Sequence, residues 1–423
     1  MSGAALLFSY LAPTVLLLAF WLFATPSPCG RTAPLKVLIG VWVVVFGVHY
    51  LIAAFQPVDL YPSSLTANLL VVGAVVAFGL GFRAVLALRK TPPRREPPRQ
   101  AAGPPGLAID LAIMIYAILV VVWALTAAGE LTGDLLSRTG LQIVRTQVNY
   151  RGADWGLVAY LGVSVAVAAV YLNVRNRGAS LIRRAPGLVV VICAVGLCVL
   201  FTQRTSLFLL VIGLVFATSA RTMPGRRTLL SMLAALVLMF LVVGLLVGKG
   251  GTADLSASSS LLLGLRALLS YFVFPLTALD QSQVWVDPAM DGAFTLRFPL
   301  AVLDAVGLSE QPPPGLVQPF IRVPALTNVY TVVHAPLSDF GPVYLVYFLG
   351  IGGLLGLVFS APRENDMVRT LQGFCIYPVA LSFFQDQFLT IASTWVQILA
   401  LTCGLHLLYG GLALRRSRTR AGR

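Results

Sequence analysis

Charged residues are scarce in this sequence: they make up 11% of its 423 residues, whereas hydrophobic residues make up 58%. About a quarter of the residues of a soluble globular protein are charged, so the composition excludes a soluble enzyme. The hydrophobic content also excludes an intrinsically disordered chain. Cysteine is rare too, and its five copies show no CxxC spacing. We therefore expect neither a disulfide framework nor a zinc site.

Acidic residues are outnumbered by basic ones, 16 to 30, which gives a net charge of +14. The basic residues are not spread along the chain but lie in short clusters between long apolar runs. This arrangement orients a membrane protein that crosses the bilayer several times. It excludes nucleic acid as the partner and predicts a lipid bilayer instead.

Long apolar runs dominate the chain, and about 20 such residues suffice for one membrane-spanning helix. They predict an all-α polytopic membrane protein, with residues 1–423 forming a single integral membrane domain. Eleven runs qualify: 4–24, 37–55, 65–82, 107–128, 155–174, 188–202, 205–219, 228–248, 341–360, 370–385 and 389–413. The sixth and seventh are short and separated by only Thr202, Gln203 and Arg204, so one kinked element is the alternative for this pair.

The distribution of charge predicts the orientation, with the N-terminus outside and the C-terminus in the cytoplasm. Of the 30 basic residues, 22 fall in the six segments that would then face the cytoplasm, as the positive-inside rule requires. These segments are 25–36, 83–106, 175–187, 220–227, 361–369 and 414–423. The second is rich in proline, which predicts an extended basic linker beside anionic headgroups.

Two long segments remain on the outer side, 129–154 and 249–340, and we expect function there because long loops in compact proteins are often functional. The larger one contains an apolar stretch, Leu261–Leu279, that predicts a short interfacial helix. The smaller one carries an arginine cluster that includes Arg145 and Arg151.

Arginines outside the membrane oppose the orientation bias and therefore need an explanation. Arg204 lies at the tight turn between two spans, and Arg297 and Arg322 flank a proline-rich turn in the large loop. A guanidinium group is planar, permanently charged and suited to phosphate oxygens. Several of them at one membrane surface would fit a lipid diphosphate; the alternative for each is a surface residue that reaches the headgroups.

Polar side chains are concentrated just before the ninth apolar run, in the segment 327–341. It holds Asn328, Tyr330, Thr331, His334 and Asp339 within thirteen residues. A histidine can accept a proton from a hydroxyl group near neutral pH, and a carboxylate can orient it. The competing interpretation is structural, with Asp339 or its neighbour Ser338 capping the following helix.

The block Asn328-Val-Tyr-Thr331, followed by Asp339-Phe-Gly341, resembles the signature of the Wzy-type O-antigen and oligosaccharide repeat-unit polymerases. Thr202-Gln-Arg-Thr-Ser206 is similar to that family's arginine turn, and Tyr271-Phe-Val-Phe-Pro275 to its aromatic-proline helix. The resemblance covers residues 190–360 and implies a polymerase/ligase fold like that of GT-C glycosyltransferases. The basic linker 83–106 and the proline-rich stretch 311–324 have no counterpart in it.

The resemblance implies extension of a glycan chain by transfer between two polyprenyl-diphosphate-linked oligosaccharides, one the donor and one the acceptor. It implies neither a nucleotide sugar, nor a cofactor, nor a metal. A flippase or a chain-length regulator would be further partners. Arginine outnumbers lysine 27 to 3, which favours a GC-rich bacterium and hence the bacterial inner membrane.

Residue roles follow as a hypothesis. Arg204, His334 and Asp339 would be catalytic, the arginine stabilising the leaving diphosphate and one of the other two accepting the acceptor's proton. Substrate binding would fall to eight residues: Arg145, Arg151, Arg297, Arg322, Tyr271, Asn328, Tyr330 and Thr331.

Three other functions stay open at this point. An O-antigen ligase would transfer a finished glycan to another acceptor. A glycosyltransferase that uses a polyprenyl-phosphate sugar would carry an acidic base in its first outer loop, where Asp59 is the one candidate. A transporter would need polar or broken helices at mid-membrane, and His49, Asp110, Asn173 and His406 are scattered rather than grouped.

Overall fold

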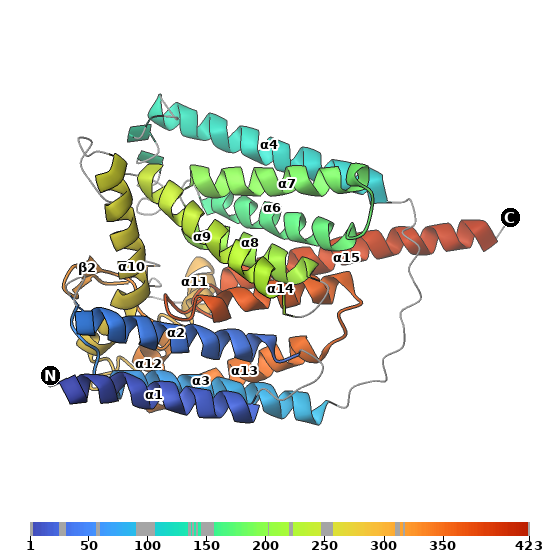
Figure 1. The fold of residues 1–423 in the computed structure, drawn as a ribbon. Coiled ribbons are helices and arrows are strands. Elements are labelled where there is room, and N and C mark those ends of the chain that lie inside the picture. Colours follow the sequence, from blue (N-terminus) through green and yellow to red (C-terminus); the bar gives the residue numbers. More distant parts are fainter. Residues whose placement is uncertain are drawn as a thin grey trace. The chain divides into compact units, whose positions relative to one another are not determined.

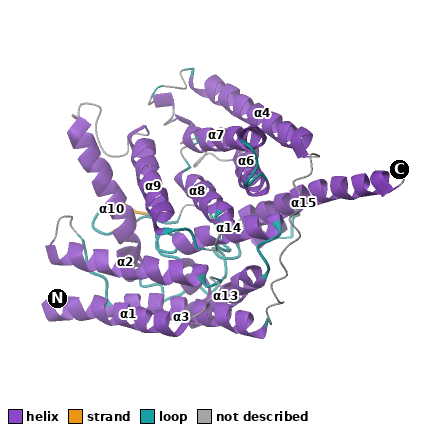
Figure 2. Cartoon of the chain, turned by 45° about the vertical axis from the view of Figure 1, so that its right-hand side comes forward, coloured by secondary structure: helices purple, strands orange, loops and turns teal. Residues whose placement is uncertain are grey.

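The fold is known from a computed structural model of the chain. It describes residues 3–24, 31–55, 60–89, 106–133, 137, 139–140, 143–144, 156–201, 203–219, 223–246, 257–308, 314–315 and 318–421. Helices make up nearly all of the regular structure there (Figure 2). Contacts divide the chain into two compact units, the first made of residues 1–92, 266–361 and 375–393, the second of the rest.

The first unit is built around three N-terminal helices, α1 (Gly3–Ala24), α2 (Ala33–Phe55) and α3 (Leu65–Leu88). It also holds most of α10 (Ala257–Ser282), α11 (Arg297–Ala305), the strands β1 (Ile321–Arg322) and β2 (Leu326–Thr327), and α12 (His334–Phe340). A short 3₁₀-helix, η3 (Gly341–Val343), then leads into α13 (Tyr344–Ser360).

The second unit consists of α4 (Leu107–Thr132), α6 (Gly156–Arg175), α7 (Leu181–Leu200), α8 (Arg204–Thr218) and α9 (Arg226–Leu246). It also contains the first part of α14 (Asp366–Ala380) and nearly all of α15 (Ala392–Ala421). Helix α7 packs on α4 and α6, and α8 packs on α6 and α9. These helices form because a backbone inside lipid must satisfy its hydrogen bonds within its own segment.

Each of the eleven predicted apolar runs lies mostly within a helix, as expected for an all-α membrane protein (Figure 1). In the described part of the chain, eight helical segments are long and apolar enough to cross a bilayer. Helices α8 and α14 have only 15 residues each, short of the usual 20. The count of eleven crossings and the GT-C-like fold therefore stay predictions. The pair 188–202 and 205–219 forms two separate helices, α7 and α8, rather than one kinked element.

Glycines bring α3 and α13 together along their length. A Cβ atom on Gly352 would lie 2.0 Å from the carbonyl oxygen of Phe78, and one on Gly81 would lie 2.0 Å from that of Leu349. The two helices run in parallel, since Tyr344 at the start of α13 donates a hydrogen bond to the Leu70 carbonyl near the start of α3. Gly352 and Gly356 have the GxxxG spacing, in which small residues on one face let two helices approach closely.

The parallel pairing has a topological consequence. If α3 and α13 both cross the membrane, both start on the same side, so the chain crosses an even number of times between their starts. The six crossings predicted from residue 65 to residue 248 satisfy this condition.

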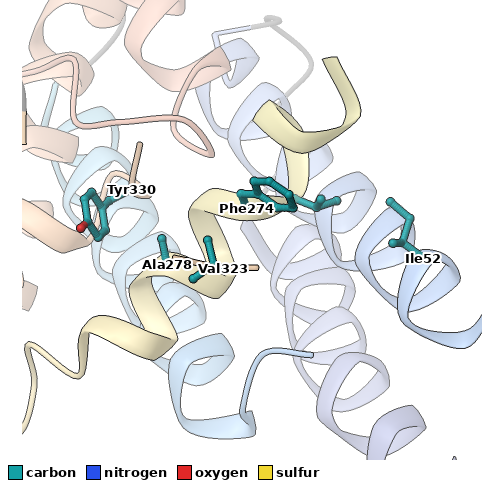
Figure 3. Close-up of a cluster of buried hydrophobic side chains, with 6 residues drawn as sticks. Ile52, Phe274, Ala278, Val323 and Tyr330 are labelled. Carbon is teal, nitrogen blue, oxygen red and sulfur yellow. The ribbon is translucent and has the colours of Figure 1, made fainter. Parts of the chain in front are cut away.

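The segment 249–340, predicted to lie outside, contains the helix that its apolar stretch predicts, because α10 covers Leu261–Leu279 completely. Part of α10 packs into a buried apolar cluster with residues from α2 and β1–β2, drawn in Figure 3: Ile52, Val273, Phe274, Ala278, Val323 and Tyr330. The two strands pair antiparallel, with Ile321 opposite Thr327. The cluster fixes the start of the 327–341 block against the helices.

Candidate active site

Tyr330 is the anchor of the 327–341 block. Its ring is 4% exposed within the apolar cluster (Figure 3), and its hydroxyl donates a hydrogen bond of 2.9 Å to the carbonyl of Pro319. Burial raises the pKa of this phenol. The ring also stacks on the imidazole of His334, with 3.9 Å between the centroids. Tyr330 thus positions His334 directly, whereas its own ring offers little surface to a sugar.

His334 lies at the first position of α12 and is 7% exposed. Its backbone N–H donates to the carbonyl of Thr331, which turns both residues into the interior. Among the described residues, neither the Nδ1 atom of His334 nor the Oγ1 atom of Thr331 has a hydrogen-bond partner, although both atoms are buried. An unsatisfied buried polar group costs about 1–3 kcal/mol, and such groups are found where a function requires them.

Asp339, near the end of the 327–341 block, binds a loop that lies about forty residues earlier in the chain. Its carboxylate accepts hydrogen bonds from the backbone N–H groups of Thr295 and Phe294, the latter at 3.4 Å. Met290 N–H adds a bond of 3.0 Å to the carbonyl of Ser338. The carboxylate therefore holds segment 290–295 against α12. The alternative role as a helix cap is wrong, because α13 begins after Val343 and has no side-chain cap.

Gly341 gives the block its bend. Its φ angle is +51°, a conformation that side chains disfavour, and a Cβ atom there would lie 2.8 Å from the sulfur of Met290. The Asp339-Phe-Gly341 motif is therefore explained by structure: the carboxylate holds the loop, and the glycine allows the chain to turn into α13.

Arg204 is the first residue of α8 in the second unit. Its guanidinium carbon lies 4.1 Å from the centre of the Phe240 ring on α9, a cation–π contact. Its Nη2 atom is 3.1 Å from the place where a Cβ on Gly244 would be. Gly244 thus leaves room for the guanidinium group, which lies over the Phe240 ring.

The other predicted binding residues differ in their surroundings. Arg297 donates a hydrogen bond of 2.6 Å from Nε to the carbonyl of Pro314, so it braces the loop after α11. Arg322 is exposed on β1, and Asn328 is half-buried. The ring of Tyr271 stacks on Phe384, with 5.7 Å between the centroids. Arg145 and Arg151 lie outside the described residues, as do most of the segments 129–154 and 83–106.

The structure thus brings Tyr330, Thr331, His334 and Asp339 together in the first unit, and it places Arg204 in the second. A small apolar pocket of about 10 Å³ is lined by Val332 and Val333 of the 327–341 block together with residues that include Trp42 and Ser382. None of the predicted site residues lines it. Among the described residues, no group of three His, Cys, Asp or Glu side chains could hold a metal ion.

Sequence reasoning missed Asp386, in the turn between α14 and α15. The carboxylate is 1% exposed and accepts hydrogen bonds from Tyr347 Oη at 3.0 Å and from the N–H of Phe388 at 2.9 Å. Burial and the nearby Asp339 carboxylate raise its pKa to about 6. The stretch Gln385-Asp-Gln387 between apolar residues was the available signal, since buried polar residues there need partners.

His49 was also missed as part of a network, because its sequence neighbours are apolar. Its Nε2 atom lies 2.8 Å from the carbonyl of Val273 on α10, so this nitrogen carries the proton and Nδ1 accepts from the hydroxyl of Tyr10 on α1. Tyr10 in turn accepts from the N–H of Ser63. The network joins α1, α2 and α10 to the turn before α3.

Two more of the scattered polar residues have partners of their own in the second unit. Asp110 accepts hydrogen bonds from Tyr409 and Asn176, and His406 lies 3.4 Å from the hydroxyl of Tyr171. These contacts give the polar residues within the helices a structural role and favour chemistry outside the spans.

Comparisons of the chain with protein-family models, with curated proteins and with solved structures gave no match.

Proposed function

We propose that the protein is a membrane glycosyltransferase that polymerises polyprenyl-diphosphate-linked oligosaccharide repeat units at the outer face of the bacterial inner membrane. The observation that carries the proposal is the setting of Arg204. A permanent charge at a helix–helix turn lies over the Phe240 ring, and the missing side chain of Gly244 leaves room for it. A planar group in a fixed orientation suits the two oxygens of a phosphate better than a mobile surface arginine does.

Arg204 would neutralise the charge that develops on the leaving group. In the proposed step, the acceptor's hydroxyl oxygen bonds to the anomeric carbon of the donor sugar, and the bond from that carbon to the diphosphate oxygen breaks. Polyprenyl diphosphate leaves with the bonding electron pair. A preorganised arginine lowers the activation free energy because it stabilises the negative charge that develops on the diphosphate in the transition state.

His334 would take the proton from the acceptor hydroxyl. Its Nδ1 atom is buried and has no hydrogen-bond partner among the described residues, and its ring stacks on Tyr330. This nitrogen can therefore accept a proton without first giving up a hydrogen bond to a described residue. Asp339 is less suited to this role because it already binds two backbone N–H groups. Since His334 is 93% buried, the acceptor reaches it only when the block opens.

A reconstituted assay tests the proposal. Purified protein in liposomes receives a defined polyprenyl-diphosphate oligosaccharide, and the products are separated by size. We expect a ladder of repeat units from the wild type and a loss of about 10²–10³-fold in rate from Arg204→Ala. The matched control is Arg226→Ala, which removes an exposed arginine from the first turn of α9.

Other outcomes would contradict the proposal. A full ladder from Arg204→Ala would show that Arg204 does not hold the diphosphate. A single transfer without a ladder indicates a ligase. Activity with a polyprenyl-phosphate sugar as the only donor, together with loss of that activity in Asp59→Asn, would indicate a glycosyltransferase that uses polyprenyl-phosphate sugars.

A further inference from the structure

Helix α11 is a nine-residue helix in which no side chain is buried. By helical spacing, Phe298 and Val302 fall on one face, and Val306 follows on from it just after the helix ends. Arg297 and Asp304 fall on the opposite face, next to Leu300. Val302 is 46% exposed and Val306 is 62% exposed. A strongly amphipathic helix whose apolar face is open needs a partner for that face.

The position of α11 follows from its attachment. The N–H groups of Phe294 and Thr295, immediately before the helix, bind the Asp339 carboxylate, and Met290 binds Ser338. Both acceptors lie in the N-terminal part of the segment His334–Ser360, which is apolar enough to span the bilayer. Helix α11 is therefore attached to the N-terminal end of that segment.

Exposed apolar side chains also occur at the start of α13 and in the loop before α11. Val343, just before α13, is 55% exposed, and Val346 within it is 63% exposed. The loop before α11 contains Val286, which is 69% exposed, and Trp285, a residue type enriched at membrane interfaces. The start of α13, the loop and α11 thus each leave apolar side chains exposed.

We infer that the segment 285–308 is an interfacial membrane-binding element, with the apolar face of α11 buried in the outer headgroup region and Asp304 facing water. The partner is the phospholipid surface of the bilayer. Three aspartates and one arginine give the segment a net charge of −2. Apolar burial rather than attraction to anionic lipids therefore drives the contact.

Nitroxide labels on single cysteines test this inference. Val302→Cys, Val306→Cys and Asp304→Cys are made in a full-length chain whose five native cysteines are replaced by alanine, with Val346→Cys as the lipid-exposed reference. The labelled proteins are placed in phosphatidylcholine nanodiscs, with and without anionic lipid. Collision rates are measured with oxygen, which concentrates in lipid, and with a nickel chelate, which stays in water.

At positions 302 and 306 we expect oxygen collisions to exceed nickel collisions, as at 346, in both lipid mixtures, with the reverse at 304. Nickel access at 302 and 306 would overturn the inference, and so would exclusion of both reagents, which indicates that protein covers the face. If the cysteine-free chain does not fold, p-benzoylphenylalanine at position 306 of the native chain should form phospholipid adducts, and none should form at 304. Equal adducts, or none at either position, would also overturn it.

Discussion

The contact between α3 and α13 can be broken by adding one methyl group. In Gly352→Ala the new carbon would lie 2.0 Å from the carbonyl oxygen of Phe78 and 2.7 Å from its carbonyl carbon. A normal carbon–oxygen contact needs more than 3 Å, so the helices must move apart by about 1 Å or more. Both partners of the clash are backbone, and no side chain can rotate to relieve it.

The magnitude follows from comparison with a neighbour on the same helix. Gly350→Ala adds the same methyl group where no atom lies within 4 Å, so it only gains the helix propensity of alanine, about 1 kcal/mol at most. Gly352→Ala gains the same propensity but overpacks the interface, which costs about 1–3 kcal/mol. We therefore expect Gly352→Ala to be the less stable variant by about that amount.

Thermal unfolding of both variants in detergent measures the difference. A thiol-reactive dye reports unfolding, because Cys198 and Cys375 are buried. The unfolding temperature should fall by several degrees in Gly352→Ala and stay level or rise in Gly350→Ala. Equal unfolding temperatures would refute the close parallel packing of α3 and α13.

Three further predictions concern the 327–341 block and its surroundings. His334→Ala should reduce polymer formation by about 10²–10⁴-fold without lowering the unfolding temperature; unchanged activity would remove the role as base. Asp339→Asn should lower stability by about 1–3 kcal/mol, unlike the exposed Asp304→Asn in the same thermal assay, and equal stability would contradict its hold on the loop. Burial raises the pKa of Asp386 from 3.8 to about 6, so the folded state binds this proton more tightly than the unfolded state does. The resulting cost is absent below pH 4, grows as the pH rises to 6, and reaches about 3 kcal/mol. The wild type should therefore lose stability between pH 4 and pH 6, whereas Asp386→Asn should not; parallel pH profiles would show that the pKa of the carboxyl group is not raised.

The helical architecture could be predicted from the sequence because lipid imposes one simple rule on the backbone. A run such as 65–82 has no low-energy state in a bilayer other than a helix. The close packing at Gly352 has a separate cause, because small residues let helix backbones approach. The prediction of helices required no knowledge of which helices are neighbours.

The candidate site could be predicted only in part, because the sequence does not show which groups share a hydrogen bond. Asp339 was predicted as an acid or base, but the structure gives its oxygens to Thr295 and Phe294, more than forty residues earlier. Asp386 and His49 were missed because the tyrosines that bind them, Tyr347 and Tyr10, each lie 39 residues away in the sequence. The roles of Arg204 and His334 stay predictions, which the assays above test.

The most direct test of the central claim, that Arg204 holds a diphosphate, is a binding measurement. The affinities of polyprenyl diphosphate and polyprenyl monophosphate are measured for the wild type and for Arg204→Ala in nanodiscs. We predict that the wild type prefers the diphosphate and that the variant loses this preference. The variant should bind the diphosphate at least about tenfold more weakly than the wild type, as expected for the loss of a charge-assisted bond. Equal diphosphate affinity in the two proteins would contradict the claim.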